Sequence, residues 1–193
     1  MNRLLFAAAA LMVLTGASAV QAETLGACVW SHLPAASQTR ILTAYERGMR
    51  SATDALQQQD LRIMGAAPDC AGRADLPALW VRSAVAAHVI QTGAAAAIMS
   101  EKNLDRARLD ATWAGASDDA RNCTLANAAK VFGIDGPTCT DRRAPETFVS
   151  ELGLKLSVRA DRRASQQALI YMNAKAQELI ALGLISHMRS PHP

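Results

Sequence analysis

Apolar residues recur every three or four positions along most of this chain, which is the spacing of an α-helix with one buried face. The first clear segment covers residues 37–59, where Leu42 and Tyr45 are two of the apolar positions. A second helix is expected over residues 76–102. Its interior Gly93 weakens a helix by about 1 kcal/mol relative to alanine, so a glycine there indicates that another helix packs close to it.

Further helices are expected in the second half of the chain. The pattern predicts one over residues 104–113 and another that starts after Ser117 and ends near Gly133, because serine caps helix N-termini and glycine commonly follows helix ends. Residues 146–188 contain no proline and keep the helical spacing, so they form either one very long helix or two helices that break near residues 159–165. A compact domain favours the break.

Together these segments predict an all-α protein, a compact bundle of five or six helices stapled by two disulfides. β-Strand formers are scarce, and aromatic residues make up only 4% of the chain. Residues 23–193 are expected to form a single all-helical domain, with an extended lead-in over residues 23–33 and a frayed tail over residues 189–193.

The first 22 residues have the pattern of a secretory signal. Arg3 supplies a positive charge, Leu4–Leu14 is an uninterrupted apolar run, and small residues precede a cleavage position after Ala22 or, alternatively, after Ala19. The run is too short for a permanent membrane span. We expect no later stretch to be apolar over enough residues to span a membrane, so no transmembrane segment is expected in the mature chain. We therefore expect residues 1–22 to be removed and the mature protein to reside in the periplasm or to be secreted.

The chain has four cysteines: Cys28, Cys70, Cys123 and Cys139. An even number of cysteines in an exported protein favours two disulfides, because the oxidising compartment stabilises the paired state. Of the three possible connectivities we prefer Cys28–Cys70 and Cys123–Cys139, since each joins a helix flank or end to a loop. Cross-links that close loops of this size stabilise a fold by about 3 to 4 kcal/mol each in the chain-entropy model.

Two other roles for Cys28 are weaker. The residues LGAC that end at Cys28 resemble the end of a bacterial lipoprotein signal, but Leu14, the end of the apolar run, lies far upstream and the charged Glu23 intervenes. Acylation would also leave an odd number of thiols. Cys28 and His32 form a C-x-x-x-H pair, which supplies only two possible zinc ligands and has no matching second pair.

His88 is the leading candidate for chemistry, because it falls on the apolar face of its predicted helix. The favoured interpretation is a core histidine hydrogen-bonded to one backbone or side-chain group, or a polar notch beside Gln91 and Thr92, and the alternative is a metal-ligand or proton-transfer role. His32 and His187 are its candidate partners in a metal site if both ends of the chain fold back onto this helix. The chain contains no nucleophile motif and no phosphate-binding loop, so no cofactor is expected and a non-catalytic role is favoured.

The charges are nearly balanced. Lys and Arg total 20 and Asp and Glu total 17, so no strong field attracts nucleic acid, and no nucleic-acid partner is expected. Four basic residues recur at helical spacing and are candidates for contact with an anionic surface: Lys155, Arg159, Arg162 and Arg163. Asp161 lies among them and Glu151 precedes the first of them by four residues, so a solvated helix face is favoured.

These features favour an exported, soluble helical protein that acts without catalysis and binds a partner protein or a small apolar ligand in the periplasm. One alternative is an enzyme or metal binder that uses His88. The other is an envelope protein tethered to a membrane, either through acylated Cys28 or through the basic stripe.

Overall fold

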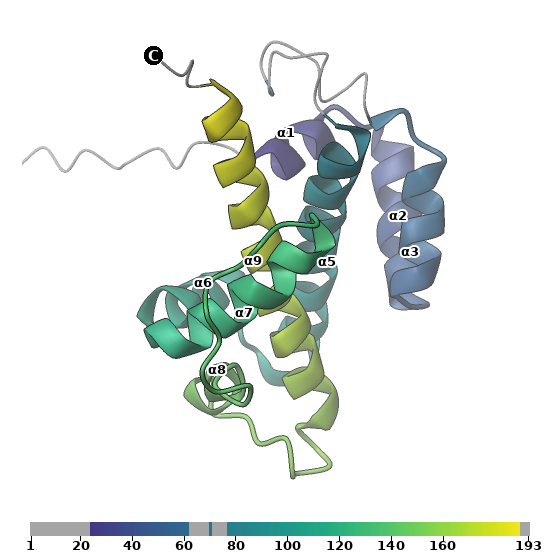
Figure 1. Cartoon of the computed structure of the whole chain (residues 1–193). Coiled ribbons are helices and arrows are strands. Elements are labelled where there is room, and N and C mark those ends of the chain that lie inside the picture. The colour runs from purple at the N-terminus through teal and green to yellow at the C-terminus, as the bar shows by residue number, and fades with distance from the viewer. Residues whose placement is uncertain (1–23, 62–69, 71–76, 190–193) are drawn as a thin grey trace, which may run out of the picture.

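A computed structural model of the chain describes residues 24–61, 70 and 77–189, with the backbone alone for 184–189 (Figure 1). The described part contains eight helices and no β-strand, which confirms the all-α class. The helices are α1 (Leu25–Ser31), α2 (Ala35–Glu46), α3 (Met49–Gln57), α5 (Ala78–Lys102), α6 (Arg106–Gly115), α7 (Asp118–Val131), α8 (Glu146–Glu151) and α9 (Arg162–Arg189).

The two longest helices, α5 and α9, pack along each other at the centre of the molecule (Figure 1). They are antiparallel, because Gln91 contacts Glu178 while Lys102 contacts Asp161. Helices α2 and α3 lie on one side of this pair, α6, α7 and α8 lie on the other, and α1 crosses near one end. The buried side chains form two clusters that both draw on α5 and α9, and many of them are alanines, which lets the helices approach closely.

The helix expected over residues 37–59 is in fact two helices, α2 and α3, which pair as a hairpin (Figure 1). Gly48 separates them and has a φ of 132°, a backbone conformation that is strained for residues with a side chain. This break is one reason why the described chain has more helices than the five or six predicted.

The lead-in expected to be extended over residues 23–33 instead contains α1, so that prediction is wrong. Thr24 caps this helix, since its side-chain oxygen accepts a hydrogen bond from the backbone N–H of Ala27 at 3.3 Å. Gly26 lies directly against α5, where an added β-carbon would be only 2.3 Å from the carbonyl oxygen of Ala84. Helix α1 is seven residues long, which is too short to show a periodic pattern, and its packing on α5 stabilises it.

The segment 146–188 does break, into α8 and α9, and the connection covers residues 152–161. Gly153 leaves α8 with a φ of 75°. Asp161 holds the far end of the connection, because its carboxylate accepts hydrogen bonds from Lys102 Nζ at 2.6 Å and from the Lys155 backbone N–H at 3.1 Å. The hydrogen bond from Lys102 is the main cause that lowers the pKa of Asp161. The tail residues 190–193 lie outside the described residues.

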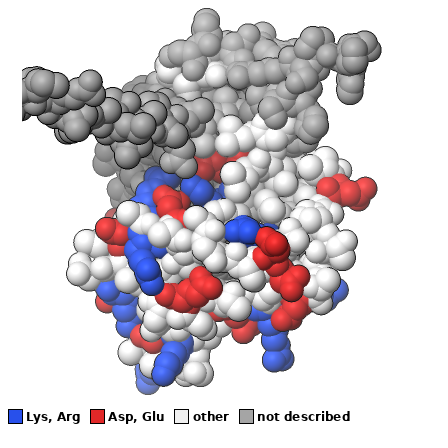
Figure 2. Space-filling view, turned by 90° about the vertical axis from the view of Figure 1, so that its left-hand side faces the viewer, with Lys and Arg blue, Asp and Glu red and all other residues white. Residues whose placement is uncertain are grey.

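The four basic residues of the predicted stripe do not share one helical face, so that expectation is also wrong. Lys155 and Arg159 lie in the connection between α8 and α9, whereas Arg162 and Arg163 begin α9. Arg163 Nε forms an ion pair with Glu101 at 2.9 Å. On the face shown in Figure 2, basic and acidic side chains are interspersed.

Helix α5 is long and apolar enough to cross a membrane by length and composition, with a mean hydropathy of 1.2 in an 18-residue window. This differs from the expectation that no stretch after the signal reaches that length. Half of the window is buried inside the fold. The helix packs against α9, α1, α2 and α3, and a core helix of a soluble protein has this same composition.

Both disulfides are present, in the two pairs preferred from the sequence. The Cα atoms of Cys28 and Cys70 lie 5.5 Å apart, and those of Cys123 and Cys139 lie 4.4 Å apart. Each bond joins a helix, α1 or α7, to a residue outside the helices. Residues 1–22 lie outside the described residues, so the signal peptide stays a prediction.

Candidate functional site

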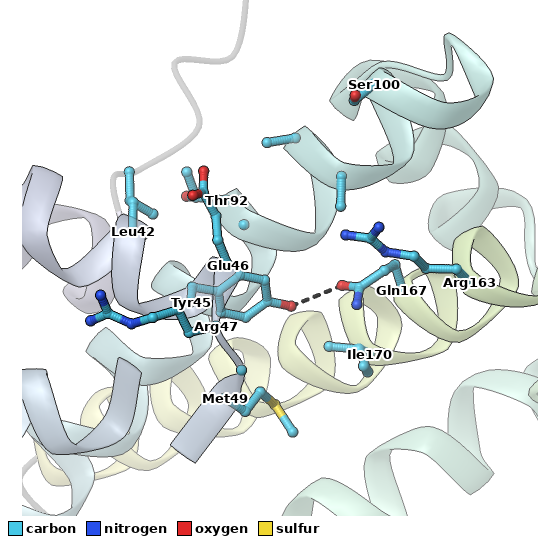
Figure 3. A pocket seen from close by; sticks show the side chains of 14 residues that line it. Leu42, Tyr45, Glu46, Arg47, Met49, Thr92, Ser100, Arg163, Gln167 and Ile170 are labelled. Atoms are coloured by element: carbon cyan, nitrogen blue, oxygen red, sulfur yellow. Dashed lines mark hydrogen bonds between the residues drawn. The ribbon is translucent and has the colours of Figure 1, made fainter. Parts of the chain in front are cut away.

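A cleft of about 850 Å³ lies between α2, the middle of α5 and the first half of α9. Leu42 and Met49 line it from the α2–α3 side, and Ile170 lines it from α9 (Figure 3). Helix α5 contributes the small residues Gly93, Ala96 and Ala97 to the lining. Met49 keeps 48% of its surface exposed, so the cleft opens to solvent beside an apolar side chain.

Tyr45 extends from α2 across the cleft toward α9 (Figure 3). Its hydroxyl donates a hydrogen bond to Gln167 Oε1 at 2.9 Å. The ring lies directly on Gly93, where a β-carbon would be 2.3 Å from Tyr45 Cδ1. The expectation that another helix packs close to Gly93 is therefore confirmed, and the helix is α2.

The cleft offers hydrogen bonds rather than reactive groups. Burial raises the pKa of Tyr45 above its ordinary value of 10.0, so the phenol stays protonated at neutral pH. The charged side chains Glu46, Arg47 and Arg163 are exposed at the rim. No histidine or cysteine occurs among the described residues that line the cleft.

His88 lies elsewhere on α5, half-buried beneath α1. Its ring packs on Trp30 of α1 with ring centroids 5.9 Å apart. Its Nδ1 atom is buried and has no hydrogen-bond partner among the described residues. Burial lowers the pKa of His88, and the nearby carboxylate of Glu178 partly opposes this effect. The imidazole is therefore neutral at pH 7. Its contact with Trp30 agrees with a role in packing, but the hydrogen bond expected for a core histidine is not found at Nδ1 among the described residues.

Glu178 is the centre of a buried polar junction next to His88. The residue is only 4% exposed, and its carboxylate accepts hydrogen bonds from Thr24 Oγ1 and from Gln91 Nε2, the latter at 3.0 Å. These bonds link α1, α5 and α9 at one point. A buried carboxylate is costly unless it is hydrogen-bonded, so the junction fixes how the three helices meet.

The proposed metal site of His32, His88 and His187 is not formed by the described residues. The only group of three potential ligands in the part of the chain that is described consists of Cys28, His32 and Cys70, and it does not include His88. The side chain of His187 lies outside the described part. His32 is the C-cap of α1 and lies beside the disulfide.

The sequence did not point to Tyr45, Gln167 or Glu178 as functional or structural polar groups. In the sequence pattern, Tyr45 is only one of the apolar positions of its helix. The helical spacing does carry a signal for Glu178. It lies four residues after Ala174 and three before Ala181, so it shares a face of α9 with these two alanines, both of which are buried. Nothing in the local pattern around Gln167 predicts its contact with α2, since the two residues are 122 positions apart.

No protein-family model, curated protein or solved structure is significantly similar to this chain.

Proposed function

We propose that this protein is a non-catalytic, exported binding protein that holds a small molecule, with a largely apolar body and one polar end, in the cleft between α2, α5 and α9. The observation that carries the proposal is the Tyr45–Gln167 hydrogen bond inside a cleft of about 850 Å³. It supplies fixed polar groups within a space that polar and apolar side chains line together.

The size and the lining support a small-molecule ligand. Ligand sites in proteins commonly have volumes of about 300 to 1,000 Å³, are mostly apolar, and contain a few precisely placed polar groups. Leu42, Met49 and Ile170 would cover the apolar body of the ligand. Covering the exposed part of Met49 would remove apolar surface from water, which favours binding by about 25 cal/mol per Å².

The polar end of the ligand has two partners. The Tyr45 hydroxyl uses its proton for Gln167, so its oxygen remains an acceptor, while the Gln167 amide group remains a donor. Ser100 and Thr92 add hydroxyls to the lining. A hydroxyl or amide on the ligand satisfies both kinds of group at once.

The lining supports binding without turnover. The raised pKa of Tyr45 makes its phenol a poor base and a poor nucleophile near pH 7. The charged groups at the rim, Glu46, Arg47 and Arg163, are exposed to solvent rather than held in a buried site.

The two disulfides are compatible with an exported protein. With the signal predicted over residues 1–22, this favours a protein that resides in the periplasm or is secreted. The Cys28–Cys70 bond argues against the acylated form of the tethered alternative, because a sulfur bonded to another cysteine has no valence left for a lipid thioether.

The test combines native mass spectrometry of the protein purified from its own envelope with binding of anilinonaphthalene sulfonate, an apolar dye with one polar group. Ala96 is an exposed residue of the cleft, so Ala96→Trp fills the cleft without entering the core. We expect this variant to bind the dye at least tenfold more weakly. The matched control is Ala111→Trp, which adds the same side chain at an exposed position of α6 outside the cleft. Equal dye affinity of the two variants would contradict the proposal.

A further inference from the structure

The side chains of Cys28, His32 and Cys70 converge at the end of α1. Their potential ligand atoms all lie within 4.8 Å of one another, and Cys70 Sγ is 3.8 Å from His32 Nδ1. We propose that this disulfide is the oxidised form of a metal site: after reduction, the two thiolates and the imidazole bind a thiophilic ion of the Zn²⁺ class. The binding site is independent of the cleft and of any ligand there.

The geometry is already close to that of a zinc site. With Zn–S bonds of about 2.3 Å and Zn–N bonds of about 2.0 Å, tetrahedral angles place sulfur and nitrogen ligands about 3.5 Å apart. The observed separation of 3.8 Å between Cys70 Sγ and His32 Nδ1 is near that value. The two sulfurs must separate to about 3.8 Å by the same bond lengths, and His32 Nδ1 must give up its hydrogen bond to the Cys28 carbonyl oxygen. Cys70 lies outside the helices, so no helix has to shift as a body.

The helical spacing explains why the imidazole is in place. His32 follows Cys28 by four residues, which puts both side chains on the same side of α1. His32 Nδ1 lies 2.9 Å from the carbonyl oxygen of Cys28, and because a carbonyl only accepts, Nδ1 carries the proton in the disulfide form. Metal binding through Nδ1 needs the other tautomer, with the proton on Nε2. His32 is exposed, so this exchange can proceed through solvent and a water molecule can complete the coordination.

The chemistry balances in two steps. An external dithiol reduces the Cys28–Cys70 bond with two electrons and two protons and becomes a disulfide itself. Zn²⁺ then displaces the two thiol protons, which are released to solvent, and the sulfurs bind as thiolates. Soft thiolate ligands favour ions such as Zn²⁺ and Cu⁺ over the harder Mg²⁺ or Ca²⁺.

The second disulfide is an internal control. Cys123 Sγ lies 3.0 Å from the carbonyl oxygen of Asp141, and no third ligand group joins Cys123 and Cys139 among the described residues. Reduction of that pair therefore yields two thiols without an imidazole, a poorer zinc site.

The experiment uses the full exported chain with the double substitution Cys123→Ser and Cys139→Ser, reduced with a phosphine and kept under nitrogen. We expect this protein to bind one Zn²⁺ per chain in competition with a chelator, and the addition of Co²⁺ to produce a thiolate charge-transfer band. His32→Ala in the same background is expected to weaken Zn²⁺ binding at least tenfold. The converse protein, with Cys28→Ser and Cys70→Ser, is expected to bind Zn²⁺ at least tenfold more weakly after reduction.

Any of the following results would overturn the proposal. Unchanged zinc affinity in His32→Ala removes the imidazole from the site, and equal affinity in the two double variants makes the site nonspecific. Circular dichroism follows the helices throughout. A reduced protein that stays helical yet binds no zinc contradicts the proposal, as does one that loses its helices on reduction or one that binds zinc equally well while oxidised.

Discussion

Replacing Gly93 by alanine should destabilise the protein, although alanine is the better helix former. Gly93 lies in the interior of α5, where alanine gains about 1 kcal/mol in helix propensity. The new β-carbon, however, would lie 2.3 Å from Cδ1 and 2.5 Å from Cε1 of Tyr45. Carbon atoms pack at about 3.5 to 4.0 Å, so the ring must retreat by more than about 1 Å.

The size of the effect follows from what the ring loses. Tyr45 is only 8% exposed, and overpacking at a buried site costs about 1 to 3 kcal/mol. A displaced ring also loses its hydrogen bond to Gln167, worth about 1 kcal/mol. After subtraction of the gain in helix propensity, Gly93→Ala should lower the free energy of unfolding by about 1 to 3 kcal/mol. Because the ring lines the cleft, dye binding should weaken as well.

The matched control is Gly183→Ala in α9, where an added β-carbon meets nothing within 4 Å. The same gain in propensity is unopposed there, so this variant should be more stable than the parent by up to about 1 kcal/mol. Urea denaturation followed by far-ultraviolet circular dichroism measures both. If Gly93→Ala is as stable as Gly183→Ala, Tyr45 does not pack on Gly93 and the description of the cleft is wrong.

Three further predictions concern the core and its cross-links. Glu178→Ala should lower the free energy of unfolding by about 2 to 4 kcal/mol, because it leaves the buried Gln91 amide and the Thr24 hydroxyl unpaired. The control Glu178→Gln should stay within about 1 kcal/mol of the parent protein, and equal losses in the two variants would contradict this prediction. Burial lowers the folded-state pKa of His88 below its ordinary value of 6.5. The contribution of the neutral imidazole to stability is therefore complete above pH 6.5. It declines as the pH falls toward the folded-state pKa, because the unfolded chain binds the proton first. Denaturation curves at several pH values should show a smaller decline for His88→Gln, and identical declines would refute it. The double substitution of Cys123 and Cys139 by serine should lower the free energy of unfolding by about 3 kcal/mol, because the disulfide closes a loop with a sequence separation of 16. An unchanged urea midpoint would refute this.

Several local features could be predicted because neighbouring residues determine them. Ser117 caps α7 as expected, with its hydroxyl oxygen accepting a hydrogen bond from the Ala120 backbone N–H at 3.2 Å. Gly133 follows α7 with a φ of 67°. The even number of cysteines and their positions at helix flanks also led to the observed pairs. The helix ends depend on interactions between residues that are close in the chain, and the disulfides depend on a choice among three ways to pair four cysteines.

The boundaries that failed are those where local signals conflict with packing. The apolar spacing continues through Gly48, so the hairpin of α2 and α3 was missed, although a single glycine is compatible with either a helix or a turn. Helix α1 is stabilised by contacts with α5 and by the bond from Thr24 to Glu178, which joins residues 154 positions apart. No window of sequence contains both partners of such a bond.

The sequence by itself determined that the chain is helical, where most helices lie, and that its four cysteines form two disulfides, because helix spacing and capping follow from short-range preferences and an even cysteine count favours pairing; the connectivity was only a preference among three. Only the tertiary structure decided which faces of α5 and α9 are buried, that Tyr45 crosses to Gln167, and that His32 lies beside the Cys28–Cys70 sulfurs. The physical reason is the composition of the core. Alanine surrounds much of α5, so its apolar pattern does not specify one face, and the rotation of each helix is set by contacts between residues far apart in the chain.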